Sequence, residues 1–306
     1  MAVMQATAIT VRVPATSANL GAGFDCLGLA LDLFAEITVT VGGPEPAPAE
    51  DVGEKMVLTA ARQFYQRIGK DMPPLRARYN VSIPLGRGLG ASAVARVAGV
   101  LAANEAEQRP LDPSQCMAIA ADLEGHGDNA CPAMFGGLQV CISANGSYLH
   151  TGTPFPAEAQ LAVLIPDHPM ATKEARKVLP ESYSKETAVH NIGRAALFVA
   201  AMAAHRFDLL DEATNDAIHQ RQRAALFPQL FDIFGAAKGA GAHAAWLSGA
   251  GSSVAAICTN DTGRTVAGAM LDRLKGAGLS GRCLTTRIAA EGASVARVEL
   301  VDIPAR

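Results

Sequence analysis

The chain contains Pro84-Leu-Gly-Arg-Gly-Leu-Gly-Ala-Ser-Ala93 between two segments of different periodicity. Before it, apolar and polar residues alternate from Leu75 to Ile83, which predicts a half-buried strand. After it, apolar residues from Val94 to Leu101 recur at helical spacing. A glycine turn that opens a helix directs unpaired N–H groups and the positive end of the helix dipole to one point. Phosphate is the ligand that best suits such a point.

The loop differs from the two most familiar phosphate-binding patterns. It lacks the Gly-Lys-Ser/Thr ending of a Walker A loop, and its glycines do not follow the spacing G-x-G-x-x-G. The loops of protein kinases are also missing from the chain. The stretch resembles instead the second motif of the GHMP kinases (galactokinase, homoserine kinase, mevalonate kinase and phosphomevalonate kinase), P-x3-G-L-G-S-S-A. Ala91 replaces the first serine of that motif, and Ser92 retains the second.

Composition limits the class of protein. The 306 residues allow one large or two ordinary domains. A formal charge of −3 does not indicate binding to nucleic acid or to an anionic membrane. The six cysteines are scattered without a C-x-x-C pair, which is typical of a reducing compartment. The longest apolar run, Ala195 to Ala204, is too short to cross a bilayer. We therefore expect a cytoplasmic protein that binds neither nucleic acid nor membrane.

A second motif lies near the start of the chain. The residues alone predict a strand over Ala8–Val13 that Pro14 ends, followed by a hairpin-like connection with Asn19 and Asp25 as turn formers. The segment from Pro14 to Asp25 also resembles P-A-T-S-A-N-L-G-x-G-F-D, the first motif of homoserine kinases. Mevalonate- and galactokinase-type relatives carry a different version at this place, so the resemblance is specific within the GHMP kinases.

A third cluster follows a predicted helix from Asp112 to about Glu124. A carboxylate at a helix C-terminus costs roughly 0.3–1 kcal/mol, which a bound cation would reverse; a solvated surface glutamate is the alternative. The run Glu124-Gly-His-Gly-Asp-Asn129, with the Pro-Ala and Gly-Gly pairs that follow it, resembles the homoserine kinase pattern E-G-H-x-D-N-x-x-P-A-x-x-G-G. No second histidine or cysteine stands at zinc spacing, and hard oxygen donors near phosphate favour magnesium.

Three segments of the second half continue the resemblance. Met170–Pro180 is similar to S-T-x-x-A-R-x-x-L-P and would place Thr172 and Arg176 one helical turn apart. Asn215–Arg223 is similar to D-x-x-H-x-x-x-R, although a charged helix face is often merely solvated. Leu247–Ser253 is similar to the third GHMP motif, L-S-G-A-G-P-S, and is expected to pack against the phosphate loop.

Two predicted helices carry features of their own. A helix over Glu54–Ile68 has Lys55 where homoserine kinases have an asparagine that helps to hold adenine. A helix over Val189–His205 shows apolar residues at core spacing, which predicts a buried face. The residues of that predicted face are Ile192, Ala196, Val199 and Ala203.

The resemblance to homoserine kinases covers nearly the whole chain. It implies a two-domain α+β fold, with a ribosomal protein S5 domain 2-like domain at residues 1–154 and a ferredoxin-like domain at residues 155–306. It also implies ATP-dependent phosphorylation of the side-chain hydroxyl of L-homoserine to O-phospho-L-homoserine, in threonine biosynthesis. A homodimer is usual in this family.

The resemblance also assigns roles to nucleotide-binding residues. ATP would be held by the phosphate loop, which consists of Pro84, Leu85, Gly86, Arg87, Gly88, Leu89, Gly90, Ala91, Ser92 and Ala93. Mg²⁺ would be held by Ser92 and Glu124. Thr172 would lie beside the γ-phosphate. This division is physically sensible, because phosphoryl transfer depends on positioning and on charge neutralisation.

The remaining roles concern the substrate. Asp25 would bind its ammonium group, and Arg176 and Arg223 would bind its carboxylate. Three further residues would line the pocket, namely Asn19, His126 and Asn129. Asn129 would lie near the reacting hydroxyl. No residue is identified as a catalytic base.

Two other functions stay open on the sequence. Another GHMP kinase, acting on a different small alcohol, would not need Arg176 and Arg223. A non-catalytic ATP-binding sensor would be compatible with the departures at Lys55 and Ala91. The retained metal-site residues Ser92 and Glu124 argue against a sensor.

Overall fold

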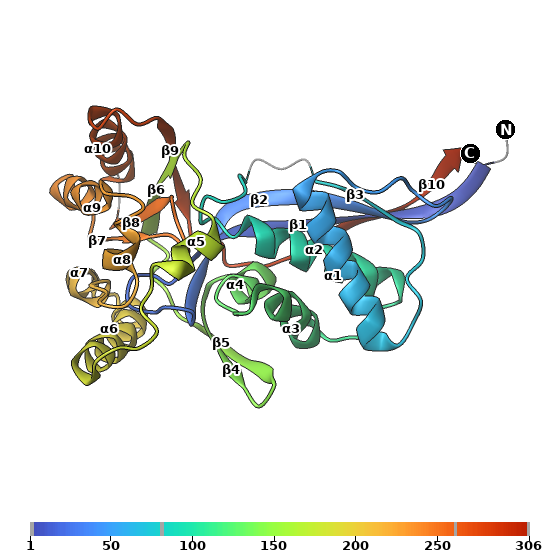
Figure 1. Ribbon diagram of the computed structural model, residues 1–306, viewed down its shortest axis with the longest axis horizontal. Coiled ribbons are helices and arrows are strands. Elements are labelled where there is room, and N and C mark those ends of the chain that lie inside the picture. The colour runs from blue at the N-terminus through green and yellow to red at the C-terminus, as the bar shows by residue number, and fades with distance from the viewer. Residues whose placement is uncertain (1–2, 80–82, 260–261, 305–306) are drawn as a thin grey trace.

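The computed structural model describes residues 3–79, 83–259 and 262–304, which form two antiparallel sheets with associated helices (Figure 1). The first sheet contains β1 (Val3–Ala18), β2 (Leu27–Gly42), β3 (Leu75–Arg78), β4 (Leu138–Ala144), β5 (Ser147–Thr153) and β10 (Ser294–Pro304). Its order is β10-β1-β2-β4-β5, and β3 also pairs with β2. The predicted strand over residues 75–83 is thus confirmed as far as Arg78, while residues 80–82 lie outside the described part of the chain.

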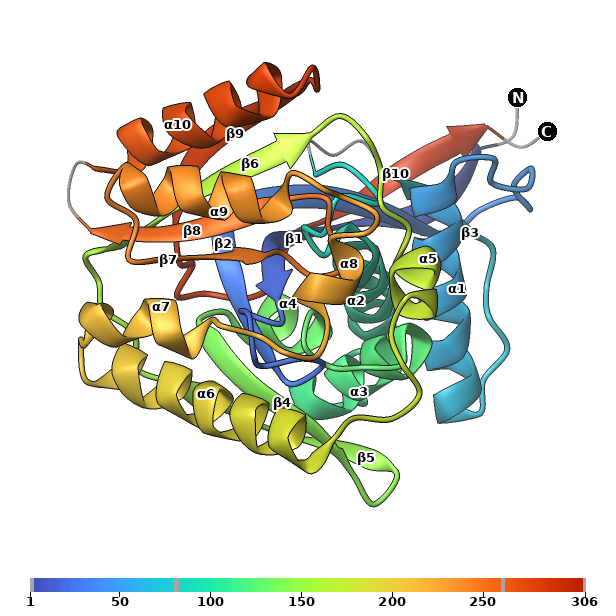
Figure 2. The same cartoon turned by 60° about the vertical axis from the view of Figure 1, so that its left-hand side comes forward.

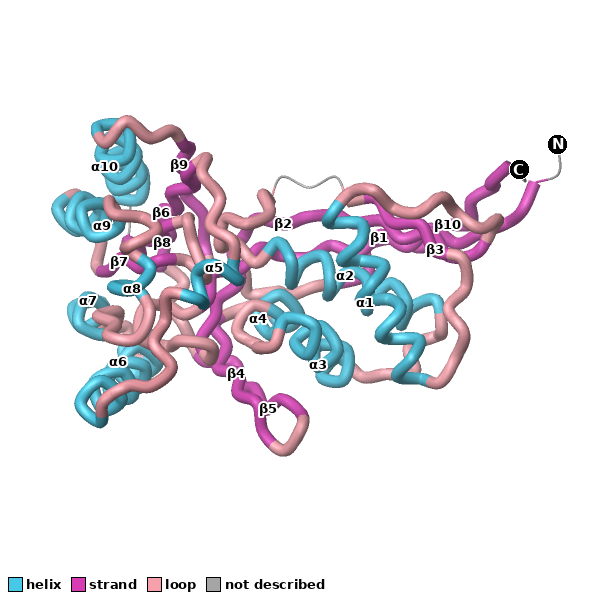
Figure 3. The backbone as a smooth tube through the Cα atoms, in the orientation of Figure 1, coloured by secondary structure: helices cyan, strands magenta, loops and turns pink. Residues whose placement is uncertain are grey.

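Four helices share one apolar core with the first sheet: three of them contact its strands, and the other packs on those three helices. They are α1 (Val52–Ile68), α2 (Ala91–Ala106), α3 (Pro113–Glu124) and the short α4 (Ala130–Phe135). Figure 3 shows them together beside the long strands β1 and β2. The helix start predicted at Asp112 is confirmed, because Asp112 and Gln115 form a reciprocal capping box.

Strand β1 differs from its prediction. Pro14 was expected to end the strand, but β1 continues through it to Ala18. The register against β2 shifts between Pro14 and Thr16, so the proline lies at an irregularity where no ladder donor is needed. The extension carries the chain to a turn in which Asn19 and Asp25 have positive φ values of 70° and 58°.

The second sheet has the order β7-β8-β6-β9 and is antiparallel. Its strands are β6 (Ala159–Pro166), β7 (Ala244–Leu247), β8 (Val254–Thr259) and β9 (Gly281–Arg287). The helices α9 (Leu230–Gly239) and α10 (Gly263–Gly276) pack together on this sheet (Figure 2), and Figure 1 shows them at one end of the molecule. A region of several helices that ends in α9 separates β6 from β7, and α10 separates β8 from β9. With α9 and α10 as its two helices, the second sheet has the β-α-β-β-α-β order of a ferredoxin-like domain. The ferredoxin-like prediction is therefore confirmed.

The last strand returns to the first sheet. The predicted division at residues 154 and 155 falls between β5 and β6, but β10 pairs with β1 from Val3↔Pro304 onwards. The second half of the chain therefore supplies an edge strand to the first sheet, which a division by position along the chain does not describe. Whether 1–154 and 155–306 are separate folding units stays a prediction.

The long segment between β6 and β7 contains α5 (Thr172–Lys177), α6 (Lys185–Ala203), η1 (Phe207–Leu209), α7 (Leu210–Ala213) and α8 (Gln220–Arg223). The predicted buried face of α6 is wrong, because Ile192 is 69% exposed and Ala196 and Ala203 are exposed too. Phe198 and Met202 are buried instead. The helix is apolar on most sides, so periodicity could not identify the packed face. Within the described ranges, no helix has the length and apolarity to span a membrane.

Candidate active site

A cleft of about 230 Å³ lies where the two halves of the chain meet. The predicted site residues that line it are Asn19, Asp25, Leu85, Gly86, Arg87, Gly88, Gly90, Ala91, Ser92, Glu124, His126, Asn129, Thr172, Arg176 and Arg223. Of the predicted phosphate loop, Pro84, Leu89 and Ala93 do not line the cleft, and Leu89 and Ala93 are buried beneath it. Residues far apart in sequence are therefore brought to one place.

The phosphate loop leads into the N-terminus of α2. Gly90 precedes this helix with a φ of 67°, and Gly88 has a φ of 72°. A Cβ at Gly88 would lie 2.0 Å from the carbonyl oxygen of Ser248, and one at Gly90 would lie 1.9 Å from Oγ1 of Thr16. Both positions therefore require glycine, for conformation and for space. The first N–H groups of α2 are left facing the cleft, as an anion site requires.

The third motif holds this loop from the other side. The hydroxyl of Ser248 donates to the carbonyl of Gly88 at 2.6 Å, and the N–H of Ser253 donates to the carbonyl of Arg87 at 3.1 Å. The expected packing of the two motifs is confirmed. Ser252, which replaces the usual proline, donates its hydroxyl to the carbonyl of His168 at 2.6 Å, a bond that proline could not make.

Glu124 faces the cleft from the last residue of α3. Its side chain is only 10% exposed, so the alternative of a solvated surface glutamate is wrong. It forms an ion pair with Arg96, one turn beyond Ser92 on α2, and this cation offsets the unfavourable helix end. The ion pair is made through Oε1 of Glu124, and both Glu124 and Ser92 line the cleft beside the phosphate loop. A carboxylate and a hydroxyl at this place are oxygen donors of the kind that fit a magnesium site.

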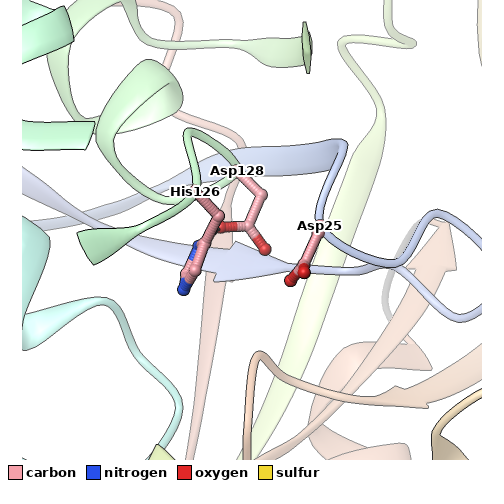
Figure 4. Close-up of side chains that lie close together, drawn as sticks. All are labelled: Asp25, His126 and Asp128. Carbon is pink, nitrogen blue, oxygen red and sulfur yellow. Dashed lines mark hydrogen bonds and ion pairs between the residues drawn. The ribbon is translucent and has the colours of Figure 1, made fainter. Parts of the chain in front are cut away.

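A group of charged side chains, here called the charged pocket, lies beside the phosphate loop. Its members are Asp25, His126, Asp128, Arg176 and Arg223. Side-chain atoms of Asp25, His126 and Asp128 lie within 4.8 Å of one another, and Figure 4 shows both carboxylates turned toward the same space. Burial by itself would lower the pKa of His126, but its hydrogen bond to Asp128 and the charge of that carboxylate outweigh this and raise the pKa.

The two arginines of the charged pocket come from α5 and α8. Arg176 Nη2 and Nη1 donate to the two oxygens of Asp25 at 2.8 and 3.0 Å. Arg223 is 2% exposed, and its guanidinium has no carboxylate partner among the described residues. Both guanidiniums lie over the ring of Phe24, with their carbons 5.5 and 5.3 Å from its centroid. Burial, and then the charge of Arg176, lowers the pKa of Arg223 to about 10, so it stays cationic at neutral pH.

Asn129 connects the phosphate loop to the charged pocket. Its Oδ1 accepts from Oγ1 of Thr16 at 2.7 Å, and its Nδ2 donates to Asp128 at 3.2 Å. Asn19 links the turn after β1 to the third motif, because its Nδ2 donates to the carbonyl of Gly249 at 2.8 Å. Thr172 begins α5, one turn before Arg176, and both line the cleft as the spacing predicts.

Comparison with known proteins agrees with this geometry. The GHMP kinases N-terminal domain family matches residues 55–137, and the GHMP kinases C-terminal family matches residues 198–276. Over 300 residues the chain is 41% identical to homoserine kinase of Deinococcus radiodurans, with 94% of this chain and 96% of that one covered. The chain belongs to the homoserine kinase family. A second relative, homoserine kinase of Synechocystis sp., is 35% identical over 94% of this chain and 98% of its own.

A solved homoserine kinase has the same fold. The crystal structure from Cytophaga hutchinsonii superposes with a TM-score of 0.85 at 25% identity and covers 94% of this chain and 97% of that one. The predicted membership in the GHMP kinases, which are small-molecule kinases, is therefore confirmed, and so is the two-domain α+β fold.

The sequence analysis gave no role to some residues of the cleft. Arg96 carries no motif signal, because only the fold brings it to Glu124. Asp128 stands in the E-G-H-x-D-N pattern, and its burial beside His126 identifies it as part of the pocket. Lys55 is exposed and lies away from the cleft, whereas Val52 and Met56 of the same helix line it.

Proposed function

We propose that this protein transfers the γ-phosphoryl group of ATP to the side-chain hydroxyl of L-homoserine, producing O-phospho-L-homoserine for threonine biosynthesis. The observation that carries the proposal is that one cleft joins a backbone anion site with a pocket that contains both carboxylate and guanidinium groups. The first suits a triphosphate, and the second suits the opposite charges of an amino acid.

The nucleotide is proposed to bind along the phosphate loop. Backbone N–H groups from Gly88 to Ser92 would donate to the phosphate oxygens, helped by the dipole of α2. Ser92 and Glu124 would hold Mg²⁺, which neutralises phosphate charge when it is bound. Val52 and Met56 supply apolar surface on the same side of the cleft, where the base would lie.

The amino-acid substrate is proposed to bind in the charged pocket. Asp25 would accept hydrogen bonds from its ammonium group, while Arg176 and Arg223 would donate to its carboxylate. His126 and Asn19 would complete the pocket wall. The hydroxyl at the other end of the substrate would then reach toward Asn129, the link between this pocket and the phosphate loop.

The transfer itself requires an in-line arrangement. A bond forms between the homoserine hydroxyl oxygen and the γ-phosphorus as the bond to the oxygen bridging β and γ breaks. ADP leaves, and the hydroxyl proton passes to a phosphoryl oxygen and from there to water. Asn129 would orient the hydroxyl, and Thr172, at the start of α5, would donate to the γ-phosphoryl oxygens. No side chain is assigned as a base, since a loose transition state requires little proton removal before transfer.

A coupled assay of ADP release tests the proposal. Purified protein with ATP and Mg²⁺ is given L-homoserine, mevalonate, galactose or shikimate in parallel. We expect kcat/KM to be highest for L-homoserine by at least about a hundredfold, because only this substrate presents both charges to the pocket. A higher value for another alcohol would assign the protein to a different GHMP activity. ATP binding with no turnover of any alcohol would indicate a sensor.

We also propose that the enzyme works as a homodimer in the cytoplasm, as the family resemblance implies. All six cysteines are free in the structure, which is compatible with a reducing compartment. Sedimentation equilibrium at micromolar concentration tests the dimer, and a mass near the 31.7 kDa of one chain would contradict it.

A further inference from the structure

The anionic and cationic sides of the charged pocket are bonded to each other. Arg176, in the last turn of α5, donates two hydrogen bonds of 2.8 and 3.0 Å to Asp25, which lies 151 positions earlier in the turn after β1. This is the paired, two-pronged geometry in which a guanidinium holds a carboxylate best. The side chains are 38% and 33% exposed, so a ligand entering the cleft can reach both.

The two arginines are held differently. Arg223 is fixed, because it donates to the carbonyls of Ala175 and Gly249 and to Nδ1 of His219. Arg176 donates side-chain hydrogen bonds to Asp25 alone within the described ranges. Arg176 can therefore leave its partner by rotating one side chain, whereas moving Arg223 would break several bonds in a buried site.

We propose that the substrate replaces the Asp25–Arg176 ion pair with its own two charges, and that this exchange selects zwitterions. The inference rests on the proposed function and deepens it. The ammonium group of the substrate takes the place of the guanidinium at Asp25. Arg176 turns onto the substrate carboxylate, which also receives the fixed Arg223. Every charge that was paired before binding is paired afterwards.

Ligands with one charge cannot complete this exchange. An ammonium group alone would take Asp25 and leave Arg176 without an anion beside the cationic Arg223. A carboxylate alone would take Arg176 and leave Asp25 unpaired. Removing one partner of an ion pair costs more than the pair contributes, although water screens part of that cost at these exposures. We expect 3-aminopropan-1-ol and 4-hydroxybutanoate each to bind the wild type roughly a hundredfold more weakly than L-homoserine.

The test is a gain of affinity in two variants. Arg176→Gln frees Asp25 and should bind 3-aminopropan-1-ol about tenfold more tightly than the wild type does. Asp25→Asn frees Arg176 and should improve the binding of 4-hydroxybutanoate by a similar factor. Both variants should bind L-homoserine more weakly. Calorimetric titration with ADP and Mg²⁺ present measures all nine affinities, and independent contacts would give no gain for either single-charge ligand.

The matched control is Lys177→Gln. Lys177 neighbours Arg176 on α5, is 60% exposed and pairs only with Glu174 of the same helix among the described residues. This variant removes the same charge and should leave the three affinities unchanged. If Arg176→Gln does not fold, Arg176→Met is used in its place, because methionine keeps the aliphatic part of the side chain. An unchanged or lower affinity of either freed variant for its single-charge ligand overturns the exchange.

The outcome is separable from that of the proposed function. If the wild type phosphorylates L-homoserine but the variants show no gain, the exchange is wrong and the function stands. If the variants show the gain while another zwitterion is the preferred acceptor, the exchange stands and the assignment of L-homoserine is wrong.

Discussion

The phosphate loop and the charged pocket face the same cleft but are held in place by different forces. The loop presents backbone N–H groups, and hydrogen bonds from Ser248 and Ser253 keep its shape. The charged pocket presents side chains from four segments of the chain. Two ion pairs hold Asp25, Arg176, His126 and Asp128, and hydrogen bonds to two carbonyls and His219 hold Arg223. The ligand specificity of the phosphate loop depends on its backbone conformation, and that of the charged pocket depends on the charges of its side chains.

This difference predicts what each region tolerates. A backbone site should accept a new side chain wherever a Cβ already exists, and should fail where glycine is replaced in a tight contact. A site made of paired charges should respond to the loss of a single charge, even when the shape of the residue is kept. The following predictions test that contrast.

The largest effect is expected at Glu124, the proposed carboxylate ligand of Mg²⁺ beside the phosphate loop. Glu124→Gln keeps the shape of the side chain and removes its charge, so the proposed metal ligand and the anionic partner of Arg96 are lost together. Turnover should fall by roughly a hundredfold or more, because metal charge neutralisation contributes several kcal/mol to phosphoryl transfer. Steady-state assays across a Mg²⁺ titration measure this, with thermal unfolding to show that the fold persists. Wild-type turnover at saturating Mg²⁺ would remove Glu124 from the site.

The next test compares two glycines of the phosphate loop. Gly88→Ala and Gly86→Ala both place a side chain at positive φ, which costs about 1–2 kcal/mol. Only at Gly88 does the new Cβ also collide with the third motif, because the nearest atom to a Cβ at Gly86 is 3.7 Å away. We expect Gly88→Ala to lose about 3 kcal/mol of unfolding free energy and to weaken ATP binding strongly. Urea unfolding measures the free energy of unfolding, and titration with ATP measures its affinity. Equal effects at the two positions would contradict a tight contact between Gly88 and the third motif.

Arg223 tests the charged pocket in the same way. Arg223→Lys keeps the charge but cannot reproduce a fork that reaches two carbonyls and His219 while donating to a carboxylate. The KM for L-homoserine should rise roughly tenfold or more, while the KM for ATP barely changes. Arg221→Lys, at an exposed position of α8, is the matched control. If the ATP affinity falls instead, the arginine belongs to the nucleotide site.

Features that depend on neighbours in sequence were predictable. The glycine turn of the phosphate loop, the helix start at Asp112 and the turn of helix from Thr172 to Arg176 each involve residues within one short segment. Local spacing specifies such features directly, and the family resemblance added candidate roles to them. The β-α-β-β-α-β order of the second domain also followed from the resemblance.

Features that depend on distant partners were not predictable. The ion pairs Arg96–Glu124 and Asp25–Arg176 join segments whose spacing contains no information about contact. The resemblance assigned Asp25 and Arg176 to the opposite charges of a substrate, but it did not indicate that they bond to each other. The prediction of the buried face of α6 was wrong for a related reason. Apolar residues surround this helix, so only tertiary packing decides which of them are buried.

The smallest effect is expected at Ala91, the departure from the family pattern inside the phosphate loop. Ala91 is the first residue of α2, is 5% exposed and lines the cleft, so its N–H remains one of the unpaired donors of the helix start. Its carbonyl accepts from the hydroxyl of Tyr79 at 3.3 Å, a contact that a serine would leave intact. If the loop binds phosphate through its backbone, Ala91→Ser should change the KM for ATP by less than about tenfold, or roughly 1.4 kcal/mol. Initial rates at saturating L-homoserine measure this value. A larger gain would show that a side-chain hydroxyl carries part of the phosphate binding, and the contrast between a backbone site and a charge site would then be incomplete.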